Sequence, residues 1–141
     1  MIALNSGFKL TLVSAMSLLA ATAAAGAAPE PCQVLPADVW GGIMGYTVTA
    51  TPGDMNCTYT GKSGGGQFRI MAVAESIAAA EAGVKRLRDL EPKDNPMAWR
   101  GGVYSSGSVV FSIALFQRAA TASTAAQLEE LVAAAKQRLP K

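Results

Sequence analysis

The chain contains two cysteines, Cys32 and Cys57, and their pairing constrains the fold more than any other feature. They follow an apolar, alanine-rich segment of the kind that directs export. Two cysteines in an oxidising compartment pair with each other, so we predict a Cys32–Cys57 disulfide. The bond closes a loop of 25 residues (57 − 32), for which the chain-entropy relation gives about 3.5 kcal/mol. Two free thiols or half of a zinc site are weaker alternatives, because the chain has no histidine.

The first 27 residues have the three parts of a secretory signal peptide. Lys9 supplies the positive charge, residues 10–25 form the apolar core, and small residues precede the cleavage site. We expect cleavage after Ala27, with Ala25 as the alternative. A membrane anchor fits less well, because the segment is short and dilute in Leu and Ile. Residues 28–141 then form one exported domain, periplasmic or secreted, without a stable membrane span.

Composition excludes several classes of function. The sequence has 12 basic and 10 acidic residues, and losing Lys9 with the leader leaves 11 − 10 = +1. This balance argues against binding to nucleic acid. The absence of histidine excludes Ser–His and Cys–His nucleophiles and most transition-metal enzymes. Acidic pairs such as Glu129 and Glu130 are typical of a solvated surface. We therefore expect no enzyme activity, no catalytic residue, no cofactor and no metal.

Hydrophobic periodicity predicts eight elements between the first cysteine and the C-terminus. Helices are expected over 35–45, where Gly45 suits the stop, over 76–90, and over 124–139, where Thr124 and Gln127 have capping-box spacing. Strands are expected over 46–51, 55–60, 67–74, 98–104 and 108–117, the last two joined as a hairpin by Ser105-Ser106-Gly107.

This order of elements predicts the fold class. Strands joined by tight turns pair antiparallel, and amphipathic helices need a sheet face to bury against. We predict an α+β fold: a two-layer sandwich whose five-stranded, mainly antiparallel sheet carries the helices on one face. The element order is one helix, three strands, a helix, two strands and a final helix.

A family resemblance follows from the same residues. Cys32, then Leu35-Pro36-Ala37-Asp38-Val39, a glycine that ends the helix, and Cys57-Thr58-Tyr59-Thr60 resemble small exported bacterial domains of unknown function, many of them lipoproteins. The resemblance covers nearly all of residues 28–141 and implies a sandwich of the PsbP and Mog1 type. The chain departs from it in lacking a lipoprotein cysteine and in its Gly41-Gly42 pair. It implies no catalytic residues.

One predicted sheet face is a candidate binding surface. The predicted alternation places three arginines and no carboxylate on the face away from the helices. Its members are Thr47, Thr49, Thr51, Thr58, Thr60, Gln67, Arg69, Arg100, Tyr104, Ser112 and Arg118. An ordinary solvated face is the alternative. The sharper hypothesis is a partner face, centred on Arg69, Arg100, Tyr104 and Arg118, for a protein or an anionic component of the envelope.

Other residues favour structural roles. Four methionines outside the leader, Met44, Met55, Met71 and Met97, are scattered and predict core filling rather than a copper site. Trp40 is expected in the core, and Trp99 either covers the core edge or contacts a partner. The chain is thus expected to be a cell-envelope binding module. A secreted inhibitor of a hydrolase or effector is the alternative, and an enzyme ranks last.

Overall fold

The computed structural model describes residues 28–94, 100–116 and 122–141. The predicted signal peptide, Met97, Trp99 and Arg118 lie outside them. The described elements are α2 (Pro31–Val34), α3 (Ala37–Met44), β1 (Thr49–Gly53), β2 (Asn56–Thr60), β3 (Gly65–Val73), α4 (Ile77–Asp89), β4 (Gly101–Ser106), β5 (Val109–Leu115) and α5 (Ala122–Arg138).

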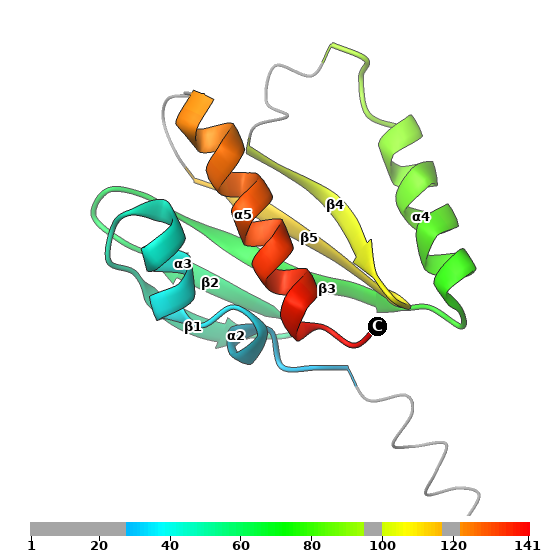
Figure 1. Cartoon of the computed structure of the whole chain (residues 1–141), viewed down its shortest axis with the longest axis horizontal. Coiled ribbons are helices and arrows are strands. Elements are labelled where there is room, and N and C mark those ends of the chain that lie inside the picture. Colours follow the sequence, from blue (N-terminus) through cyan, green and yellow to red (C-terminus); the bar gives the residue numbers. More distant parts are fainter. Residues whose placement is uncertain (1–27, 95–99, 117–121) are drawn as a thin grey trace, which may run out of the picture.

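The five strands form one sheet in the order β1-β2-β3-β5-β4, and each neighbouring pair is antiparallel. The predicted α+β class, antiparallel sheet and element order are confirmed, with α2 as an additional short helix. Helices α2, α3 and α5 lie over one face, and α4 lies alongside β4 (Figure 1). No described helix is long and apolar enough to cross a membrane.

The predicted disulfide is present and joins α2 to β2. Cys32 and Cys57 have their sulfurs 2.02 Å apart and their Cα atoms 5.0 Å apart. Cys57 is fully buried, on the same face of β2 as Tyr59. The bond therefore fixes the segment before α3 to β2, the strand between β1 and β3.

An aromatic stack forms the centre of the core beneath α3. The rings of Trp40 and Tyr59 lie 3.9 Å apart and nearly parallel, and the Tyr59 hydroxyl donates a hydrogen bond to the carbonyl of Leu35. Gly66 of β3 makes room for the indole, since a Cβ there would lie 2.5 Å from Trp40. The helix ends as predicted at Gly45, whose φ of +81° suits glycine. The core role predicted for Trp40 is confirmed.

Helix α5 completes the main core with Leu128, Leu131 and Ala135, and Leu139 follows directly after it; all four are buried. The capping box predicted at its start is wrong. The helix already begins at Ala122, so Thr124 lies inside it and is buried. The Gln127 amide instead donates to the carbonyls of Ile43 and Met44, which satisfies the C-terminal end of α3.

Helix α4 is held more lightly. Ser76 caps its start by accepting a hydrogen bond from the Ala79 N–H. Only Ala80 and Val84 of α4 are buried, in a small second cluster with Val110. The predicted stripe residue Ile77 is 53% exposed. Helix α4 therefore adds much less apolar burial than α3 or α5.

A β-bulge changes the end of β3. The register pairs Ile70 with Phe111 and then Ala72 with Val110, leaving Met71 as the extra residue. The bulge interrupts the alternation, so Ala72 is exposed rather than buried as the uninterrupted pattern predicted. Met71 is 45% exposed.

Candidate functional site

The open face of the sheet is defined by the strand register. Residues paired across antiparallel strands share a face, and neighbours along a strand alternate between faces. Cys57, Phe68 and Ile113 point into the main core. The residues between them make the opposite face: Thr49, Thr51, Asn56, Thr58, Thr60, Gln67, Arg69, Val103, Val110, Ser112 and Ala114, together with Ser105, Gly53, Gly65 and Gly101. At the β4-β5 end of this face, Val103 and Val110 pack against Ala80 and Val84 of α4. The open face is therefore the part of it that α4 leaves uncovered.

Threonine dominates one end of this open face. Thr49 lies opposite Thr60, and Thr51 lies opposite Thr58, so four hydroxyl side chains form two cross-strand pairs on β1 and β2. Gln67 continues the second row on β3. The pattern is the half-solvated face typical of an antiparallel sheet, with short polar side chains that leave the surface flat.

Arg69 is the charged residue of the open face, and it is exposed. It lies opposite Asn56 on β2 and Ser112 on β5, so its cross-strand neighbours are uncharged. No carboxylate lies on the described strand residues of this face. Arg69 therefore has the position that the sequence predicted for it.

Tyr104 lies on the other face, and its predicted place on the partner surface is wrong. It pairs with Phe111, and the two rings lie 5.7 Å apart beside the main core. The cause is the hairpin turn. The predicted three-residue turn would place Tyr104 opposite Ser108, whereas the observed pairing of Ser106 with Val109 leaves two turn residues. The partner of Tyr104 is therefore Phe111 rather than Ser108, a register shift of three residues (111 − 108). Any shift by an odd number of residues moves the strand's side chains to the opposite face.

The structure does not place the other two arginines on the open face. Arg100 precedes β4, is half-buried and makes other contacts. Arg118 lies outside the described residues. Of the four residues predicted as the centre of the partner face, the structure thus places Arg69 alone on the open sheet.

A hollow at the turn between β1 and β2 contains two methionines beside Arg69. Met55 and Met71 line it together with Asp54, Asn56, Ile70 and Arg69. Both methionines are at least 40% exposed, so the predicted core role is wrong for them, although it holds for Met44. Met71 is the extra residue of the β3 bulge and follows Arg69 by two residues. Met55 has a positive φ of 57°, which is uncommon outside glycine and Asn.

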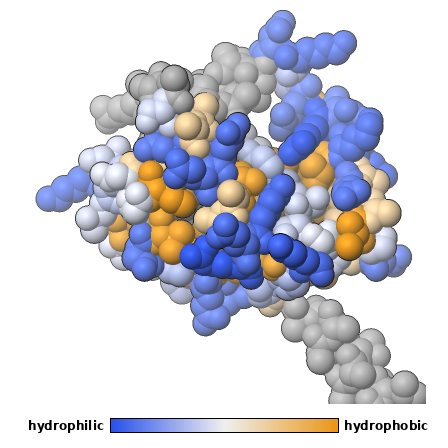
Figure 2. All heavy atoms as spheres, in the orientation of Figure 1, coloured by the Kyte–Doolittle hydropathy of each residue, from blue (hydrophilic) through white to orange (hydrophobic). Residues whose placement is uncertain are grey.

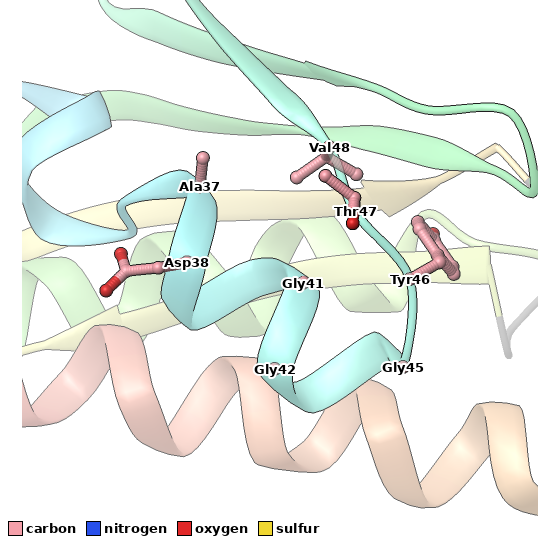
Figure 3. Close-up of a pocket in the computed structure, with 8 residues that line it drawn as sticks. All are labelled: Ala37, Asp38, Gly41, Gly42, Gly45, Tyr46, Thr47 and Val48. Carbon is pink, nitrogen blue, oxygen red and sulfur yellow. The ribbon is translucent and has the colours of Figure 1, made fainter.

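A second hollow, of about 530 Å³, lies along one side of α3. Figure 3 shows Asp38 near the start of α3, Tyr46 past its end, and Gly41, Gly42 and Gly45 between them. Thr47 and Val48, which lead into β1, form the other wall. The glycines leave this side of α3 without side chains, and Asp38 is the one charged lining residue.

A third hollow lies where α4, β4 and α5 meet, around Tyr104. Arg88 of α4 donates two hydrogen bonds to the Val103 carbonyl, 3.2 and 3.0 Å long, and its guanidinium lies 5.5 Å from the centre of the Tyr104 ring. Burial raises the pKa of the Tyr104 hydroxyl; Arg88 opposes this, and Glu91 and Glu129 add to it. Lys85 is paired with Asp89 at 2.7 Å. Arg88 therefore holds α4 against the sheet edge, whereas the Lys85–Asp89 pair lies within α4 itself.

The face covered by α2, α3 and α5 carries only small apolar areas among its described residues (Figure 2). Figure 2 shows small hydrophobic areas on this face, separated by hydrophilic side chains. Within the described ranges, no group of three or more Cys, Asp or Glu side chains is placed to hold a metal ion. The open face around Arg69 is the candidate site.

The chain has no match among protein-family models, curated proteins or solved structures. The resemblance to small exported bacterial domains stays a prediction.

Proposed function

We propose that the protein is an exported binding module of the cell envelope, without catalytic activity, and that its partner contacts the open sheet face. The observation that carries the proposal is that Arg69 is exposed on the open sheet and has the uncharged cross-strand neighbours Asn56 and Ser112. The described strand residues of this face include no carboxylate, and Asp54 of the β1-β2 turn lines the adjoining hollow. Arginine binds carboxylate and phosphate groups through paired hydrogen bonds. The partner is therefore an acidic protein surface or another anionic component of the envelope.

Two further features support this proposal. The Cys32–Cys57 disulfide suits an oxidising, extracytoplasmic compartment. The threonine pairs beside Arg69 supply hydroxyl groups that can donate to or accept from a partner. The predicted leader supplies the route of export.

The test reverses one charge and compares it with a matched reversal elsewhere. Arg69→Glu places a carboxylate on the open face, while Arg86→Glu makes the same change at an exposed position of α4. Both side chains are exposed, so both variants are expected to fold with stability close to that of the unaltered protein.

The measurement is affinity capture from the organism's own envelope extract. We expect at least one partner that is retained by the unaltered protein and by Arg86→Glu to be lost with Arg69→Glu. Retention of every partner by Arg69→Glu would overturn the proposal. Retention of a single secreted hydrolase, inhibited on binding, would instead favour the inhibitor function.

A further inference from the structure

The two edges of the sheet differ in how they are covered. The β4 edge is flanked by α4, and the Arg88 side chain donates to the Val103 carbonyl on it. Strand β1 is the opposite edge and pairs with β2 alone. Residues 46–53 of this edge carry no charged side chain. An uncovered edge without charges is a template for an additional strand.

The outward backbone groups of β1 can be identified from Pro52. Proline has no N–H, so in an edge strand its nitrogen points away from the neighbouring strand. Because the direction of the backbone groups alternates, those of Ala50 also point away from β2. The backbone groups of Thr47 point the opposite way from those of Ala50 and Pro52, toward β2. The Gly61 distance agrees with this, because a Cβ added to Gly61, on the β2 side, would lie 2.5 Å from the Thr47 carbonyl oxygen. Ala50 therefore offers a free donor and acceptor to an added strand.

The α3 hollow lies on this same outward side. The backbone groups of Tyr46 point the same way as those of Ala50, away from β2. The Tyr46 carbonyl is directed at α3, because a Cβ added to Gly41 of that helix would lie 2.6 Å from the Tyr46 oxygen. The walls of the hollow continue through Thr47 and Val48 to the start of β1. A strand added at β1 would have alternate side chains on the α3 side, where the hollow of about 530 Å³ is open.

We propose that the β1 edge and the α3 hollow form one docking site for an extended segment of a partner protein. The segment pairs with β1 through its backbone and places alternate side chains in the hollow, the mode called strand addition. Asp38 is the one charged residue of the lining, so the segment carries a lysine or arginine among small or apolar residues. This site is separate from Arg69 and does not depend on the open-face proposal.

Gly42 provides a sharp test because the fold does not require it. A Cβ there would meet no other part of the molecule within 4 Å, and its φ is not positive. Gly42→Leu should therefore fill the hollow without disturbing the fold. Gly83→Leu is the matched control, because Gly83 also lies within a helix, α4, and also has open space around it. Ala50→Pro removes the outward N–H.

The probe is a library of displayed linear peptides of about 12 residues, selected on the purified oxidised protein. We expect selected peptides to alternate in polarity and to carry a basic residue. For a synthesised winner, Gly42→Leu and Ala50→Pro should each weaken binding about tenfold or more, and Asp38→Asn by a few-fold. Gly83→Leu and Arg69→Glu should leave binding unchanged.

Several outcomes would overturn the proposal. These are a selection without binders, winners without alternation, or winners whose binding Gly42→Leu and Ala50→Pro do not weaken. Sedimentation velocity could also reveal a concentration-dependent dimer that Ala50→Pro abolishes. That result would show that the β1 edge pairs with a second copy of the chain instead of a partner segment. Because Arg69→Glu is expected to be silent here, failure of this site and failure of the open-face proposal are distinguishable.

Discussion

The two ends of the sheet are stabilised by different means. At the β1-β2 end, a disulfide, the Trp40–Tyr59 stack and the hydrogen bond from Tyr59 to Leu35 fix α2 and α3 to the sheet. At the β4 end, α4 is held by two small buried residues and by exposed polar contacts of Arg88.

This difference matches the placement of the surfaces proposed for binding. The open threonine pairs and the α3 hollow both lie at the covalently tied end. A binding surface on rigid elements loses less conformational entropy when a partner binds. Helix α4, although held by few contacts, covers the edge strand β4, which would otherwise be free to pair with other chains. On the two binding proposals, recognition belongs to the tied end, and α4 covers the opposite edge.

Removing the disulfide should have the largest effect on the tied end. We expect the double variant Cys32→Ala/Cys57→Ala to lose about 3.5 kcal/mol of unfolding free energy. Urea unfolding of the oxidised protein and the variant measures the difference. A loss below about 1 kcal/mol would show that packing, rather than the covalent bond, fixes this end.

Tyr59→Phe tests the same end through pH. Below about pH 10, loss of the hydrogen bond to Leu35 should lower the unfolding free energy by about 1–2 kcal/mol. Burial raises the pKa of Tyr59 well above its ordinary value, so the unfolded chain loses this proton first. Stability should therefore fall above about pH 10, with Tyr59 contributing about 1.4 kcal/mol per pH unit.

The Tyr59→Phe variant is also the control for the alkaline loss of stability, because it lacks the Tyr59 hydroxyl. Chemical unfolding of both proteins between about pH 8 and pH 11.5 should show a shallower alkaline loss for Tyr59→Phe. Tyr104, whose pKa is also raised, leaves a residual slope in both. Parallel curves would contradict the buried, neutral state assigned to Tyr59.

Arg88→Met should have the smallest effect, at the α4 end. The change keeps an apolar stem but removes the hydrogen bonds to Val103 and the contact with Tyr104. We expect the free energy of local opening of α4 to fall by about 1 kcal/mol, and global stability to change less. Arg86→Met, an exposed change on the same helix, is the control and should alter neither.

The sequence predicted the architecture well because periodicity and a covalent tie act locally. The alternation of Val109, Phe111, Ile113 and Leu115 marked the core face, and all four are buried. The export context of Cys32 and Cys57 led to the correct pairing. The errors arose where the register differs from regular alternation: the hairpin turn that changed the partner of Tyr104, and the bulge at Met71 that left Ala72 exposed.

The candidate site was harder to predict than the fold. Arg69 lies in the long, regular part of β3, so alternation placed it correctly. The α3 hollow depends on the distance between α3 and the chain entering β1, and no local pattern encodes that distance. In the sequence, Gly41 and Gly42 stood out only as a departure from the family resemblance, although both line the hollow.

Native-state hydrogen exchange of the unaltered, oxidised protein tests the contrast between the two ends most directly. The amides of Val84 and Leu87 in α4 should exchange through local opening, at a free energy several kcal/mol below that of global unfolding. Those of Tyr59 and Phe68 should exchange only on global unfolding. Equal protection of α4 and of the β2-β3 strands would contradict the account.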